Sequence, residues 1–165
     1  MSDEKETFRE EEEEAGAGES EIIHDLGKGI VAGLAGAVAV AVLVFLKGAV
    51  GFLPDVNIVA LLGNLAGLGA GIGGWLVLLA GGGVLGVAFA ALDAHVGHVT
   101  GAGEVVHGIL FAVLLWAALM LILVPVYGEE TYAVAFAIAV LAGNLVFGIV
   151  MGAVYGALQP EEASN

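Results

Sequence analysis

The sequence predicts an all-α polytopic membrane protein with four transmembrane helices. Hydrophobic residues make up 59% of the 165 residues, and the mean hydropathy of +1.00 is too high for a soluble domain of this size. Four apolar runs, each about 20 residues or longer, contain almost no charge, which is the pattern of helices that cross a bilayer. Cysteine is absent, which excludes disulfides and thiolate sites.

The chain begins with an acidic segment, residues 1–21, that we expect to be a disordered tail. Residues 1–25 hold eleven of the eighteen acidic residues and two of the four basic ones. A block of like charge with few apolar residues cannot bury enough surface to become ordered. The net charge of −14 excludes a nucleic-acid partner, because the chain has no basic face for phosphate. So strong an acidic bias is also typical of proteins from high-salt habitats, where a charged surface stays solvated.

A four-helix transmembrane domain is expected over residues 22–158, with a short C-terminal tail at 159–165. The predicted spans are residues 27–52, 71–94, 104–127 and 131–158. Residues 55–67 are apolar but too short to cross, which is typical of an interfacial or re-entrant helix. Three basic residues precede or open the first span, and only Lys47 lies near its far end. The positive-inside rule therefore places both termini in the cytoplasm of a multi-pass cell-membrane protein.

Small residues recur at intervals of four in the first, second and fourth predicted spans. This spacing creates a flat helix face that another helix can approach closely. The glycines of these faces are Gly29, Gly33, Gly82, Gly86, Gly148, Gly152 and Gly156. Such faces can hold one chain together or build a homo-oligomer, and the sequence leaves both interpretations open.

The second and fourth spans resemble each other. Residues 79–92 and 141–154 are identical at six of fourteen aligned positions. This similarity favours a tandem repeat of two helix pairs, related by an axis along the membrane normal. The alternative is chance, because helices rich in glycine, alanine, leucine and valine align easily.

A short polar connector, residues 93–107, separates the two halves. It holds three of the four histidines, and Glu104 lies three residues before His107 on the same face of a helix. Imidazole and carboxylate groups together suit zinc, iron, nickel or copper. The candidate metal ligands are His95, His98, Glu104 and His107, with His24 expected on the same side of the membrane. Haem ligation by the histidines, solvated interfacial histidines and a pH switch are the alternatives.

Several short motifs carry a resemblance to a known family. They are Phe52-Leu53-Pro54-Asp55, Gly86-x-x-Phe89-Ala90, His107-Gly108-Ile109-Leu110-Phe111 with Trp116 and Pro125, and Phe147-Gly148-x-x-x-Gly152-x-x-Tyr155-Gly156. In these motifs, residues 27–158 resemble a haloarchaeal family of small integral membrane proteins of unknown function. The resemblance implies a membrane architecture of this kind and no catalytic residue.

Three functions are consistent with the sequence. A non-enzymatic membrane protein, structural or accessory to a membrane complex, is favoured because hydrolase, nucleotide-binding, zinc-protease and kinase motifs are absent. The second is metal or haem binding at the connector, and the sequence identifies no particular cofactor. The third is a small solute or ion pathway. Ionisable residues are missing from the middle of the last three spans. The polar candidates are Asn144 and, depending on where the second span begins, Asn64, and Trp116 is expected in the core. The expected partners are the lipid bilayer and either a second copy or a membrane complex.

Overall fold

The computed structural model describes the backbone of residues 3–50, 58–100, 102–127 and 134–159, and most side chains from residue 23 onward in these ranges. This part of the chain is helical apart from short turns, and it contains no strand. Its elements are α1 (Asp3–Val50), α2 (Ile58–Leu65), the π-helical turn η1 (Gly69–Gly73), α3 (Gly74–Thr100), α4 (Glu104–Tyr127) and α5 (Val134–Leu158). The all-α prediction is confirmed.

Four of these helices are long and apolar enough to cross a membrane. The spanning stretches are Ile23–Leu46, Gly71–His95, Glu104–Pro125 and Phe136–Leu158. The prediction of four spans is therefore confirmed, and the predicted ends differ from these by at most six residues. α2 lies within the short apolar stretch predicted at 55–67, whose first three residues fall outside the described part of the chain.

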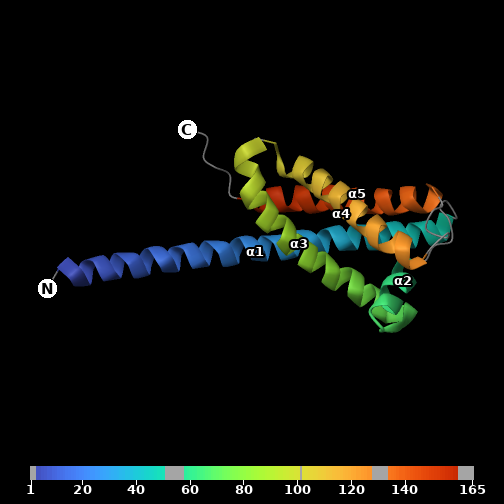
Figure 1. Ribbon diagram of the computed structural model, residues 1–165, viewed down its shortest axis with the longest axis horizontal. Helices are drawn as coiled ribbons and strands as arrows, with labels where there is room; N and C mark the ends of the chain where they lie inside the picture. Colours follow the sequence, from blue (N-terminus) through green and yellow to red (C-terminus); the bar gives the residue numbers. More distant parts are fainter. Residues whose placement is uncertain (1–2, 51–57, 101, 128–133, 160–165) are drawn as a thin grey trace.

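The acidic segment differs from its prediction. In place of a disordered tail over residues 1–21, the structure has helix from Asp3 onward, continuous with the first span. Glutamate, alanine, lysine and arginine are good helix formers, and an existing helix can be extended without the cost of a new nucleus. Figure 1 shows the resulting long α1, whose N-terminal part projects beyond the bundle.

The bundle is built from two helix pairs. α1 packs extensively against α3, and α4 packs extensively against α5. α1 also contacts α5, which joins the pairs, whereas α3 and α4 share only a small contact although they follow each other in the chain. In Figure 1, α1 and α5 run side by side while α3 and α4 cross the bundle obliquely.

Glycines make the contact between α1 and α3. A Cβ atom added to Gly29 would lie 2.6 Å from the carbonyl oxygen of Gly86, and one added to Gly33 would overlap the carbonyl oxygen of Gly82. A Cβ atom on Gly82 would lie 2.5 Å from the Cβ of Ala37, and one on Gly86 would overlap the carbonyl oxygen of Gly29. The two backbones can approach this closely only because these positions lack side chains.

The contact between α4 and α5 uses glycines in the same way. A Cβ atom on Gly148 would overlap the carbonyl oxygen of Gly108, and one on Gly108 would overlap the carbonyl oxygen of Gly148. Gly152 lies against the backbone of Glu104, and a Cβ atom on Gly156 would lie 3.0 Å from Oε2 of Glu104. All seven glycines singled out in the sequence thus lie at helix–helix contacts within the chain, and Gly108 joins them.

Aromatic side chains fill the space between the pairs. Phe89 of α3 is buried and makes edge-to-face contacts with Phe111 of α4, at a centroid distance of 5.7 Å, and with Tyr155 of α5, at 5.4 Å. Phe147 of α5 packs over Gly36 of α1, where a Cβ atom would lie 2.8 Å from the ring. α3, α4 and α5 therefore meet at one aromatic cluster. α1 is held to α5 by the ring of Phe147, which lies against Gly36.

Candidate functional site: a polar cap on the bundle

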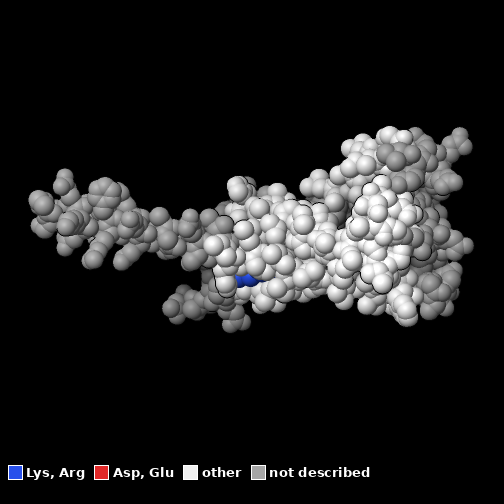
Figure 2. Space-filling view, turned by 90° about the horizontal axis from the view of Figure 1, so that it is seen from below, with Lys and Arg blue, Asp and Glu red and all other residues white. Residues whose placement is uncertain are grey.

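The charged side chains that the structure describes lie together at one end of the bundle. They are Asp25, Lys28, Asp93 and Glu104. With His107, Tyr155 and Gln159 they form a group that we call the polar cap, to which each of the four spanning helices or its end contributes. Figure 2 shows the contrast with the rest of the molecule: on this face the described surface is uncharged apart from one small basic patch.

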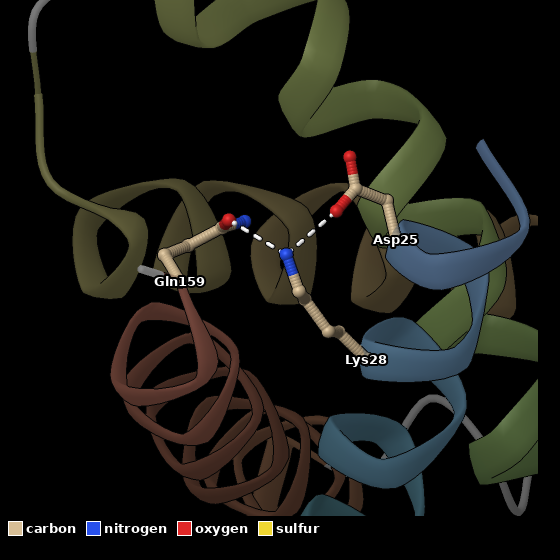
Figure 3. Close-up of polar contacts among 3 residues, drawn as sticks. All are labelled: Asp25, Lys28 and Gln159. Atoms are coloured by element: carbon tan, nitrogen blue, oxygen red, sulfur yellow. Dashed lines mark hydrogen bonds and ion pairs between the residues drawn. The ribbon is translucent and has the colours of Figure 1, made fainter. Parts of the chain in front are cut away.

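Lys28 links α1 to the end of α5. Its Nζ donates to Oδ1 of Asp25 at 2.8 Å and to Oε1 of Gln159 at 3.2 Å (Figure 3). Asp25 and Lys28 share a helix face because they are three residues apart. The Lys28 side chain is only 10% exposed. An ammonium group so deeply buried needs these partners, because an unpaired buried charge is costly.

Asp93 and His107 link α3 to α4. Oδ1 of Asp93 lies 2.5 Å from Nδ1 of His107, and the two side chains are 14% and 5% exposed. A carboxylate at this distance favours the tautomer in which Nδ1 carries the proton and donates it. The facing ends of α3 and α4 are therefore joined by a charge-assisted hydrogen bond.

Tyr155 lies under the centre of the cap. Its side chain is 2% exposed, with the ring against Phe89 and the hydroxyl hydrogen-bonded to the side chain of Gln159. Tyr155 thus joins the Lys28 side of the cap to the Asp93 side.

The cap contains a duplicated arrangement that the sequence alignment missed. Gly86 and Gly148, which align with each other in the two similar stretches, face Gly29 and Gly108 respectively. Aligning these partners places Asp25-Leu-Gly-Lys28-Gly29-Ile30 opposite Glu104-Val-Val-His107-Gly108-Ile109. Each half therefore opens with an acid, a base three residues later and a packing glycine, and in each half the base reaches the second helix of the other half. The two glycine contacts lie at aligned positions, which favours the tandem repeat. The partners of the two bases do not, because Asp93 aligns with Tyr155 and not with Gln159.

The predicted metal ligands are not brought together in the described part of the chain. Nδ1 of His95 lies 2.9 Å from the carbonyl oxygen of Ala91, in its own helix, and the ring is exposed. His107 faces Asp93, and Glu104 faces Gly156. The side chain of His98 falls outside the described residues. Among those that are described, no group of three or more histidine, aspartate or glutamate side chains is close enough to hold a metal ion.

Of the three polar or aromatic residues singled out in the sequence, which are Asn64, Trp116 and Asn144, only Trp116 links two helices by a hydrogen bond within the described part of the chain. Nε1 of Trp116 donates to the carbonyl oxygen of Ala137 at 3.0 Å and so joins α4 to α5. The Asn144 side chain donates to the carbonyl oxygen of Val140 at 3.0 Å, within its own helix, and Asn64 is exposed at the end of α2. Every fully buried polar side-chain atom in the described residues has a hydrogen-bond partner.

Comparison with known proteins gives a family and no closer relative. Neither the curated proteins nor the solved structures contain a significant match to the chain. The model of a family described as "Family of unknown function (DUF6789)" matches residues 23–165. The match begins at Ile23, where the first membrane-spanning stretch of α1 begins, and it includes the whole polar cap. The protein therefore belongs to this family of unknown function, DUF6789.

Proposed function

We propose that the protein is a non-enzymatic integral membrane protein that serves a structural or accessory role in a membrane complex. The observation that carries this proposal is the pairing of charge within the cap. Lys28 is held by Asp25 and Gln159, and His107 by Asp93, so these groups stabilise the contacts between helices. A helix bundle whose polar groups are used to hold its own helices together is suited to a supporting role.

The polar cap faces the cytoplasm in this proposal. The helical extension of α1, with its glutamates, begins at the same end of the bundle as the cap, as Figure 1 shows for the N-terminal part of α1. The basic residues near this end, Lys5, Arg9 and Lys28, favour the cytoplasmic side by the positive-inside rule. The acidic part of α1 would then extend into the cytoplasm.

A partner in the membrane would bind on the apolar surface of the spans. Large apolar side chains are exposed on several helices, for example Phe45 of α1 (76%), Val84 of α3 (69%) and Leu121 of α4 (78%). Lipid covers such surfaces in a solitary membrane protein, and a second helix covers one of them in a complex. The three residues lie on different helices and therefore sample different parts of the surface.

Photo-crosslinking in native membranes tests the accessory role. A photoreactive amino acid is placed at Phe45, Val84 or Leu121 in separate variants, with exposed His95 as the control outside the apolar surface. We expect one of the three positions to give a protein adduct of discrete mass, and the others to give lipid adducts. Adducts at multiples of 16.5 kDa would identify the partner as a second copy of the chain. Lipid adducts alone from all three positions would contradict the proposal.

A further inference from the structure

Residues 58–73, between α1 and α3, form a compact hairpin at the end of the bundle opposite the polar cap. It consists of α2, a glycine turn and η1, which leads directly into α3 (Figure 1). α2 has eight residues and spans about 12 Å at 1.5 Å per residue, whereas the hydrocarbon core of a bilayer is about 30 Å thick. The hairpin is therefore too short to cross.

The inner face of the hairpin is packed by small residues. A Cβ atom on Gly63 would overlap the carbonyl oxygen of Gly69, and one on Gly74 would overlap the carbonyl oxygen of Val59. Val59 itself is 4% exposed, and Leu61 packs against the buried cluster around Leu123. These contacts fix α2 against the start of α3 and leave its other face outward.

Backbone hydrogen bonds within the turn satisfy part of its polar groups. The N–H of Leu68 donates to the carbonyl oxygen of Gly63 at 2.9 Å, and the N–H of Gly67 donates to that of Asn64 at 3.0 Å. Together with the positive φ of 69° at Gly67, this is a Schellman motif, which satisfies carbonyl groups at the end of a helix. Non-helical backbone can lie in a membrane only when its polar groups are satisfied in this way or buried in protein.

The outer face of the hairpin is apolar and continuous with the surface of a spanning helix. Leu65, Leu68 and Ile72 are 54%, 60% and 79% exposed, and exposed Leu76 follows on the first turns of α3. The sequence has no charged residue from Val56 to Leu92, although a turn in water usually contains some. Within the hairpin itself Asn64 is the polar exception, and an amide suits the headgroup boundary.

We propose that this hairpin lies in one leaflet of the bilayer without crossing it, with Leu65, Leu68 and Ile72 in contact with lipid acyl chains. Lipid is the occupant because the outer face continues the membrane-facing surface of the span Gly71–His95, in which Ile72 lies. The hairpin anchors the outer ends of α1 and α3 in the leaflet opposite the polar cap. The proposal does not depend on whether the protein has an accessory role.

Spin-label accessibility tests this placement, and the absence of native cysteine gives a clean background. Single cysteines are placed at Leu65, Leu68 and Ile72, with Val84 as the lipid-facing reference and His95 as the aqueous reference. The labelled proteins are reconstituted in phosphatidylcholine vesicles, and collisions with oxygen and with a water-soluble nickel chelate are measured. Three positions are used so that the test survives the loss of one variant that fails to fold.

Compared with His95, the hairpin positions should show fewer nickel collisions and more oxygen collisions. Their ratio of oxygen to nickel collisions should match the ratio at Val84. A ratio like that at His95 would mean that the hairpin lies in water and would overturn the proposal. A label that is immobile and protected from both reagents would also overturn it, because the outer face would then be covered by protein.

Discussion

Replacing Gly86 by alanine should destabilise the protein by about 1–3 kcal/mol, the usual cost of forcing extra atoms into a packed contact. The new methyl group would overlap the carbonyl oxygen of Gly29, and backbone cannot rotate away as a side chain can. Gly148→Ala should have an effect of similar size, because its methyl group would overlap the carbonyl oxygen of Gly108. The measurement is the unfolding free energy of each variant in mixed micelles with increasing denaturing detergent.

Two glycines that align with each other supply matched controls for these variants. Gly81 and Gly143 occupy equivalent positions in α3 and α5, and a Cβ atom on either would meet nothing within 4 Å. Gly81→Ala and Gly143→Ala should be neutral or stabilising by up to about 1 kcal/mol, because alanine is the better helix former. Equal stability of the Gly86→Ala and Gly81→Ala variants would show that the contact between α1 and α3 is not as close as described.

Replacing His107 by leucine should cost about 3 kcal/mol, because it leaves the carboxylate of Asp93 buried without its partner. Asp93→Leu should also be destabilising, because it removes the carboxylate that Nδ1 of His107 contacts. The double variant should be more stable than the sum of the two single changes predicts, since a buried pair can be replaced by apolar residues at much lower cost. The same denaturing-detergent titration measures all three.

His95 is the control for this pair. It lies in the same region of the chain, is exposed, and its ring nitrogen contacts only a carbonyl of its own helix among the contacts described. His95→Leu should therefore change the unfolding free energy by less than about 0.5 kcal/mol, as surface substitutions usually do. Additive effects of the Asp93 and His107 variants, with no coupling between them, would contradict the direct link between α3 and α4.

The membrane architecture could be predicted from the sequence because it depends on the hydropathy, charge and glycine spacing within each segment. Four long uncharged runs predict four spans, and glycines spaced four residues apart predict close helix faces. Periodicity also marks Gly29 and Gly33 as one face, but it does not identify Gly86 and Gly82 as their partners. The charge of the acidic segment predicts a disordered tail, whereas the structure has helix from Asp3 onward, because good helix formers continue a helix that already exists.

The polar cap could be predicted only in part. The sequence places Asp25, Glu104 and His107 near one side of the membrane, because their side follows from the number and limits of the spans. Which groups pair depends on helix rotation: His107 faces Asp93, fourteen residues earlier, and His95 faces its own backbone. The spacing of histidines along the connector carries no information about the direction of each ring. The contribution of Gln159, which was assigned to the C-terminal tail, depends on how α5 packs beside α1.

The four-span bundle with a polar cap at one end is tested most directly by labelling single cysteines from outside intact cells. One cysteine is placed at the cap end of each spanning helix, at His24, His95, Gly103 or Gln159, in the cysteine-free chain. A membrane-impermeant maleimide should label none of the four in intact cells and all four after permeabilisation. Labelling of some of these positions but not others in intact cells would contradict the bundle, because the four helix ends would then lie on different sides of the membrane.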